Sequence, residues 1–167
     1  MRNKSVYGFL IIVTLVFCLA LAPSATAASD EEEIIQVEEN FIKALATNDF
    51  DLISSLYWHS SKTTQFGPGF LRGSLWKGWD KIGALWEYGL TSSDETSQST
   101  FRSFFQNPEV TMLKDDVAII NGYEMEVTID PATEEESYTK LRVTRVVQKI
   151  GGKWLIVHEH VSSHPTQ

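Results

Sequence analysis

Hydrophobic positions have a helical spacing in the first part of the chain and a strand-like spacing in the second. Apolar residues recur every three or four positions from Ile34 to Ala46, which predicts an amphipathic helix. Acidic residues at positions 30–33 precede it and complement the positive end of its dipole. Asn48-Asp49 ends this helix, and a second, short helix is predicted from Phe50 to Trp58. The two segments therefore predict a helical hairpin.

Turn-forming residues divide the middle of the chain into short elements. Gly67-Pro68-Gly69 separates two short predicted strands, residues 62–66 and 70–76. A third helix is predicted from Gly78 to Leu90. The polar segment 91–100 is typical of a surface loop, with a lid as the alternative interpretation.

Long strands are predicted from residue 101 onward, at residues 101–113, 117–129, 137–149 and 154–161. A bend or bulge is expected at Asn107-Pro108, because proline cannot donate a hydrogen bond to the neighbouring strand. Gly151-Gly152 lies between two β-branched runs and predicts a tight antiparallel hairpin, since both glycines can adopt positive φ. Helices followed by long strands predict an α+β fold: a curved antiparallel sheet packed on the N-terminal helices.

The first 27 residues have the pattern of a secretory signal peptide. Two basic residues precede an apolar run from Phe9 to Ala22, and Ala25-Thr26-Ala27 matches the small-x-small cleavage pattern. The apolar run is shorter than the ~20 residues that span a bilayer, which favours cleavage over a retained anchor. We therefore expect residues 1–27 to be removed and residues 28–167 to form one exported domain, periplasmic or secreted and free of the membrane.

The composition of this domain indicates what stabilises it and which classes of partner it disfavours. The single cysteine, Cys18, lies in the signal peptide, so the mature domain has no disulfide and depends on its hydrophobic core. Without the signal peptide, 12 basic residues face 22 acidic ones, a net charge of −10. This charge argues against nucleic acid and anionic lipid as partners. The sequence also lacks phosphate-binding and dinucleotide fingerprints, so no cofactor is expected.

Strand alternation makes Arg145 the best single indicator of a pocket. The odd positions of segment 137–149 are apolar and should face the core, yet Arg145 shares that face. A buried guanidinium needs a carboxylate or a ligand, because burying an unpaired charge costs several kcal/mol. Glu124 and Glu126 share one face of the preceding strand, and that face is either concave or solvated. Two interpretations stay open: a ligand site in which Glu124 contributes, or an internal salt bridge without a ligand.

The last strand carries a histidine pair. Alternation places His158 and His160 on one face with Trp154 and Ile156, and Glu159 on the other. Either histidine could act as a general base, since an unperturbed imidazole has a pKa of about 6.5. The alternative is packing beside the tryptophan or a position at a dimer interface. No metal is expected, because zinc requires a third protein ligand and no cysteine or suitable aspartate is available.

Aromatic residues are concentrated in the first helices and their connections. They could form the wall of a pocket for an aromatic ligand, or simply pack in the core. The expected ligand-binding residues combine these aromatics with the polar candidates: Arg145, Glu124, Tyr57, Trp79, Tyr123 and His160. Candidates for proton transfer are His158, His160 and Glu124.

The order of elements, together with several short segments, resembles the nuclear transport factor 2-like superfamily. The segments are EIIQVEENFIKALATNDF (33–50), NPEV (107–110), DDVAI (115–119), Arg145-Val146 and GKWLIVHEHVS (152–162). Within the superfamily, the chain is most similar to the SnoaL-like group and to the association domain of calcium/calmodulin-dependent protein kinase II. The resemblance implies a cone-shaped fold with a pocket between sheet and helices, and homodimers or larger rings formed through the outer sheet face.

The resemblance does not assign a reaction, because the superfamily includes isomerases, cyclases, dehydratases and non-enzymatic hubs. The association domain lines its pocket with several arginines. In this chain Arg145 matches one of these arginines, whereas Glu124 and Val161 occupy positions at which the association domain has arginine. We expect a small-molecule-binding domain, with two alternatives. One is a cofactor-free isomerase, cyclase or hydrolase-like enzyme, and the other is a homo-oligomerisation scaffold. Whether the chain is an enzyme stays open.

Overall fold

The computed structural model describes residues 29–67, 75–91, 100–130 and 132–163 of the 167-residue chain. The predicted signal peptide lies outside the described residues. So do most of the polar segment 91–100 and the beginning of the predicted strand 70–76.

Three helices precede the long strands: α2 (Asp30–Thr47), α3 (Phe50–Leu56) and α4 (Trp79–Thr91). The start of α2 is a capping box, in which the Ser29 hydroxyl accepts from the Glu32 backbone N–H and the Glu32 carboxylate accepts from the Ser29 N–H. This box explains why α2 begins four residues earlier than its apolar spacing predicts. The predicted second helix ends early at Leu56, because Tyr57 has an extended backbone and pairs with Ile156 of the last strand.

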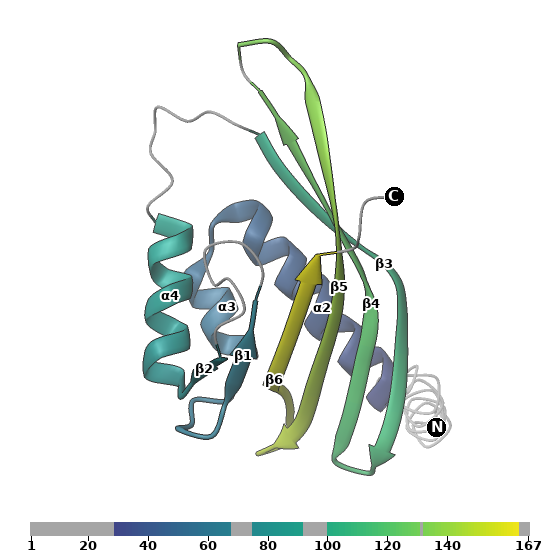
Figure 1. Ribbon diagram of the computed structural model, residues 1–167. Coiled ribbons are helices and arrows are strands. Elements are labelled where there is room, and N and C mark those ends of the chain that lie inside the picture. Colours follow the sequence, from purple (N-terminus) through teal and green to yellow (C-terminus); the bar gives the residue numbers. More distant parts are fainter. Residues whose placement is uncertain (1–28, 68–74, 92–99, 131, 164–167) are drawn as a thin grey trace, which may run out of the picture.

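The strands form one six-stranded sheet in the order β2-β1-β6-β5-β4-β3. Their bounds are β1 (Thr64–Phe66), β2 (Leu75–Lys77), β3 (Thr100–Lys114), β4 (Val117–Ile129), β5 (Glu136–Ile150) and β6 (Lys153–Ser163). The last four strands form the expected antiparallel meander, and β1 pairs parallel to β6. Figure 1 shows the helices on one face of this curved, open sheet and the β4–β5 hairpin projecting beyond them. The α+β prediction is confirmed.

Two predicted local features of the sheet are also confirmed. Gly151 and Gly152 have φ angles of 59° and 81° and form the tight turn between β5 and β6. The register of β3 against β4 shifts between Gln106 and Glu109, where Asn107 has a φ of 52°. The expected bulge at Asn107-Pro108 is therefore present.

A second bulge, in β6, was not anticipated and reverses part of the predicted alternation. Val147 pairs with Ile156 and Val146 pairs with His158, so Val157 is an extra residue without an opposite partner. After this residue the faces exchange, and Glu159 joins Ile156 on the buried side. The prediction that the two histidines share a face with Ile156 and Trp154, with Glu159 opposite, is therefore wrong.

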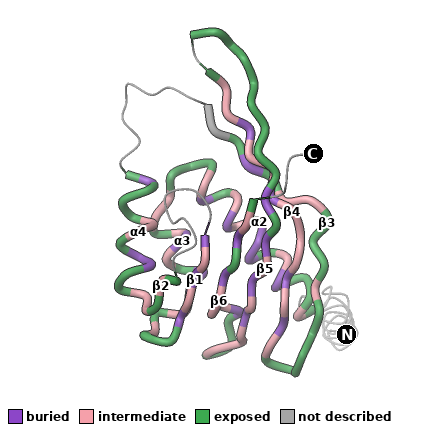
Figure 2. Tube along the Cα trace, viewed as in Figure 1, coloured by how far each residue is buried: buried purple, intermediate pink, exposed green. Residues whose placement is uncertain are grey.

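The hydrophobic core lies between the helices and the half of the sheet that is far from the exposed end of the β4–β5 hairpin. Figure 2 shows buried segments along α2 and the central strands, whereas the end of the β4–β5 hairpin is exposed. Core residues come from both layers: Ile34, Val37, Phe41, Ala44, Ile53, Ile82, Ala118, Ile120, Val147, Trp154 and Ile156. In the described part of the chain, no helix is long and apolar enough to cross a membrane.

Candidate functional site

A fully buried arginine, Arg145 at the centre of β5, organises the interior between sheet and helices. Its Nε donates to Glu159 Oε2 at 2.8 Å, and its Nη1 donates to Glu38 Oε2 at 2.5 Å. Glu124 Oε2 lies 3.9 Å from Nη2, and the Phe41 ring lies beneath the guanidinium at 3.8 Å. One guanidinium thus faces three buried carboxylates. We call Arg145, Glu38, Glu124 and Glu159 the interior charge cluster.

Neighbouring polar groups hold two of these carboxylates in place. Glu159 accepts from the Tyr57 hydroxyl at 2.9 Å and from Gln65 Nε2 at 3.0 Å. Glu124 accepts from the Ser103 hydroxyl at 2.6 Å. Hydrogen bonds of this kind reduce the cost of burying a carboxylate. The cluster therefore joins helix α2, the connection after α3, and strands β1, β3, β4, β5 and β6.

The charges in the cluster do not balance, because three ionised carboxylates would leave a buried excess of two negative charges. Burial raises the pKa of Glu38 and of Glu124, and the attraction of Arg145 offsets this only in part. Burial alone would favour a neutral arginine, but the carboxylates hold the pKa of Arg145 above its usual value, so the guanidinium stays charged. A proton on Glu38 or on Glu124 halves this excess, and protons on both remove it.

Several buried polar atoms around the cluster have no protein hydrogen-bond partner among the described residues. They include the acceptors Glu38 Oε1 and Gln65 Oε1 and the donors Arg145 Nη2 and Trp76 Nε1. These atoms belong to one neighbourhood, since Gln65 pairs with Trp76 across β1 and β2 and also donates to Glu159 of the cluster. Buried polar groups usually have a partner, so these four atoms are exceptions within the described interior.

The structure separates the predicted ligand-binding residues into two groups. Arg145, Glu124 and Tyr57 lie together in the buried interior, where Trp79 packs on Tyr57 with ring centroids 5.4 Å apart. Tyr123 and His160 project from the opposite face of the sheet, as does the proton-transfer candidate His158. One pocket cannot be lined by both groups. A role in ligand binding stays a prediction for each of these residues.

Sequence reasoning missed the two strongest partners of Arg145. It considered Glu124 and Glu126, whereas the structure places Glu38 and Glu159 at hydrogen-bond distance. A signal for Glu38 was present, because this residue lies four positions after Ile34 on the apolar stripe of α2.

The opposite face of the sheet, which we call the outer face, is defined by two rows of cross-strand neighbours. One row contains Lys77, Thr64, His158, Val146, Ile119 and Thr111; the other contains Leu75, Phe66, His160, Thr144, Asn121 and Glu109. His158 Nδ1 lies 2.7 Å from the Thr64 hydroxyl, and Phe66 packs near both histidines. Burial and the nearby His160 lower the pKa of His158. The two rows contain one carboxylate, on the edge strand β3.

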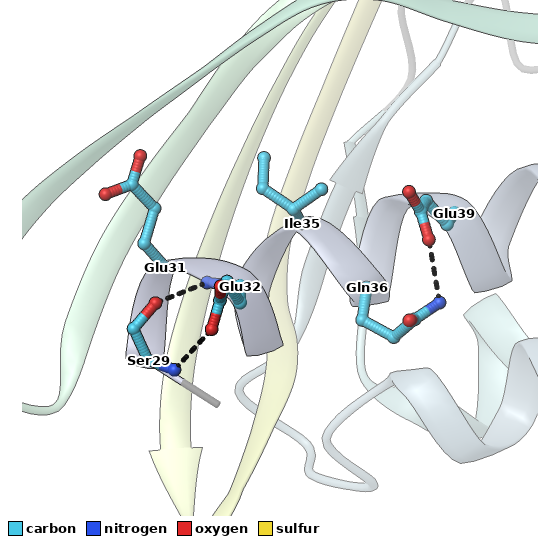
Figure 3. A pocket seen from close by; sticks show the side chains of 6 residues that line it. All are labelled: Ser29, Glu31, Glu32, Ile35, Gln36 and Glu39. Atoms are coloured by element: carbon cyan, nitrogen blue, oxygen red, sulfur yellow. Dashed lines mark hydrogen bonds between the residues drawn. The ribbon is translucent and has the colours of Figure 1, made fainter. Parts of the chain in front are cut away.

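A hollow of about 490 Å³ lies against α2, away from the interior charge cluster. Figure 3 shows its lining, which is Ser29, Glu31, Glu32, Ile35, Gln36 and Glu39. Glu32 is occupied by the capping box, and Glu39 accepts from Gln36 at 3.0 Å. Within the described ranges, no group of three histidine, cysteine, aspartate or glutamate side chains is placed to hold a metal ion.

Comparison with known proteins agrees with this fold. The delta subunit of calcium/calmodulin-dependent protein kinase type II from Oryctolagus cuniculus is 29% identical over 136 residues, which are 81% of this chain and 24% of that subunit. This chain thus spans about a quarter of that relative. The structure of the S. rosetta CaMKII hub is 22% identical with a TM-score of 0.66, covering 83% of this chain and 100% of the hub.

A nuclear transport factor 2-like superfamily protein from Salmonella enterica has a similar structure at 20% identity. Its TM-score is 0.64, and the match covers 81% of this chain and 91% of that protein. The model of one family, the calcium/calmodulin dependent protein kinase II association domain, matches residues 30–165. The chain therefore belongs to the calcium/calmodulin-dependent protein kinase II association domain family, within the nuclear transport factor 2-like fold.

Proposed function

We propose that this chain is a homo-oligomerisation domain in which two copies associate through the outer face. The observation that carries the proposal is the composition of that face. Ile119 and Val146 lie side by side at its centre, and Phe66 and Leu75 extend it toward β2. Beyond the two rows, Phe104 adds an exposed ring on the same side of β3. No described helix covers these side chains (Figure 1). A face with uncovered apolar side chains is stabilised when a second protein covers it.

The distribution of charge favours the same face. The mature chain has a net charge of −10, so most approaches between two copies are repulsive. Acidic residues are concentrated in the first turn of α2 and between residues 130 and 136. The outer face has a single carboxylate, Glu109, and carries Lys77. Contact through these two rows therefore brings only one carboxylate of each copy into the interface.

The test is the mass of the mature protein in solution, measured by sedimentation velocity. We expect an oligomer for the wild type and a monomer for Ile119→Glu, because a carboxylate at the centre of the outer face would be buried without a partner. Tyr88→Glu is the matched control, since Tyr88 is 68% exposed on α4, on the helical side of the sheet. A monomeric wild type, or an Ile119→Glu variant that stays oligomeric, would overturn the proposal.

A second candidate function is the binding of a small polar molecule beside the interior charge cluster. It is favoured by the unpartnered buried atoms, which offer acceptors on Glu38 and Gln65 and donors on Arg145 and Trp76. A matching ligand would carry both donor and acceptor groups. Native mass spectrometry should find a small molecule that co-purifies with the wild type. The variant Trp76→Phe, which removes the indole N–H donor and keeps an aromatic side chain, should retain this molecule less well. A wild type without added mass would count against this function. We propose no reaction.

We also propose that the chain is exported after removal of residues 1–27. The support is the sequence pattern of that segment, two basic residues followed by an apolar run and a small-x-small site. N-terminal sequencing of protein from the periplasm or medium should begin at Ala28. A chain that keeps Met1 in the cytosol would refute the proposal.

A further inference from the structure

The histidine pair lies near the middle of the outer face. Strand β6 has β1 and β2 on one side and β5, β4 and β3 on the other. Because the bulge at Val157 reverses the alternation, His158 and His160 project away from the helices instead of into the core. His158 is partly buried, with its Nδ1 fixed at 2.7 Å from the Thr64 hydroxyl, and His160 is exposed.

Among the described residues, the strands directly beside β6 place no carboxylate next to these imidazoles on the outer face. From β1 and β2, the facing groups are Thr64, Phe66, Leu75 and Lys77, of which only the lysine is charged. From β5, the facing groups are Thr144 and Val146, which are uncharged. Their charged neighbour in β6, Glu159, points to the opposite side and is bonded to Arg145, Tyr57 and Gln65. Burial and the nearby His160 lower the pKa of His158, and the attraction of Glu159 opposes this only in part. In the two described rows of this face, protonated histidines would therefore lie near Lys77, while the one carboxylate, Glu109, lies beyond β5 and β4 on the edge strand β3.

An interface between identical faces brings equivalent residues of two copies toward each other. In a two-fold contact the same patch is present on both sides, and residues near its centre lie close to their own equivalents. Two histidine pairs would then share one partly dehydrated contact. Neutral imidazoles are compatible with such a contact, whereas up to four imidazolium groups together with the lysines would repel one another.

We propose that His158 and His160 make the association of two copies through the outer face reversible by mild acid. This inference rests on the proposed oligomerisation and adds its regulation. The associated state binds fewer protons than the separate copies, because contact disfavours the charged imidazoles. By linkage, each histidine that must lose its proton on association weakens binding tenfold per pH unit below its pKa. Association is therefore complete at pH 7.5 and weakens steeply between pH 6.5 and 5.5.

The experiment measures the dissociation constant of the mature protein by sedimentation at pH 7.5, 6.5 and 5.5. The wild type should weaken at least tenfold between pH 6.5 and 5.5, whereas His158→Gln/His160→Gln should weaken less than threefold. His59→Gln is the matched control, because His59 lies on the helical side, stacked on Trp79, and should keep the wild-type response. Circular dichroism at each pH shows whether the monomers remain folded.

The outcomes distinguish failure of the proposed oligomerisation from failure of its pH dependence. A wild type that is monomeric at pH 7.5 overturns the proposed function and this inference together. A wild type that is equally associated at pH 7.5 and 5.5 overturns the inference alone. If the double variant does not associate at pH 7.5, the single variant His160→Gln, which keeps the contact between His158 and Thr64, takes its place. If the dissociation constant of His160→Gln changes with pH as steeply as that of the wild type, the role of the histidine pair is refuted.

Discussion

Replacing Arg145 by methionine tests the interior charge cluster directly. Methionine fills much of the space of the arginine stem but supplies no charge and no hydrogen-bond donor. Glu38 and Glu159 then lose donors at 2.5 and 2.8 Å, and Glu124 loses its nearest positive charge. All of these groups stay buried, so the carboxylates must bind protons if the fold is to persist.

The magnitude follows from this protonation. Adding a proton to an ordinary glutamate carboxyl costs about 3.7 kcal/mol at pH 7 and about 1 kcal/mol at pH 5. Burial already raises the pKa of Glu38 and of Glu124, so the additional cost is about that of one more protonated carboxyl in the cluster. The lost contact of the guanidinium with Phe41 adds about 1 kcal/mol. We therefore expect Arg145→Met to lower the free energy of unfolding by about 4–5 kcal/mol at pH 7 and by about 2 kcal/mol at pH 5.

Urea unfolding at both pH values measures this difference. Arg142→Met is the matched control, because Arg142 is exposed on the same strand and donates to the Ser163 carbonyl. Its replacement should change the free energy of unfolding by less than about 1 kcal/mol, and equally at both pH values. If Arg145→Met is unfolded at pH 7, Arg145→Lys keeps the charge and should show a smaller loss. A loss below about 1.5 kcal/mol for Arg145→Met at pH 7, or equal losses at pH 7 and 5, would refute the reasoning.

Two further predictions concern the sheet. Burial and the nearby Glu124 raise the pKa of Glu126 from 4.5 to about 7, so its stabilising effect is present below pH 4.5 and is lost as the pH rises through 7. Because Glu126 is partly exposed, we expect the free energy of unfolding of Glu126→Gln to exceed that of the wild type by only about 1–2 kcal/mol at pH 8, and to equal it at pH 4. Urea unfolding measures both values. An equal difference at the two pH values would contradict the raised pKa of Glu126. A Cβ at Gly122 would overlap the Phe105 ring and lie 3.0 Å from the Gln106 carbonyl oxygen, so Gly122→Ala should lose about 1–3 kcal/mol in the same assay. Gly152→Ala meets no neighbour within 4 Å and should lose only about 1 kcal/mol, from its φ of 81°; equal losses would exclude the steric explanation.

Alternation along the strands predicted much of the interior correctly. Leu141, Val143, Arg145 and Val147 are buried on one face of β5, as their odd positions indicate. The need of a buried arginine for carboxylates was equally predictable, because it follows from the cost of an unpaired charge. The identity of those carboxylates was not, since Glu38 and Arg145 are 107 residues apart in the sequence.

The error in β6 has a physical cause that alternation cannot detect. A bulge inserts one residue, Val157, into a run in which every neighbour is compatible with a strand. No glycine or proline marks the position. The register becomes visible only when β5 is paired opposite, and it moves Glu159 inward and His158 outward. A slip of one position therefore decided both the partner of Arg145 and the face that carries the histidines.

The position of Glu159 in the last strand also limits when folding can be completed. Glu159 bonds Tyr57 across 102 residues and Gln65 across 94, and the Lys149 ammonium reaches back 119 residues to Asp30 at the start of α2. During synthesis the helices therefore emerge long before the groups that fix them to the sheet. Contacts so distant in sequence form slowly. In a nascent chain that lacks β6, Arg145 would have no contact with Glu159. The chain can therefore reach its native fold only after nearly all of it has been synthesised.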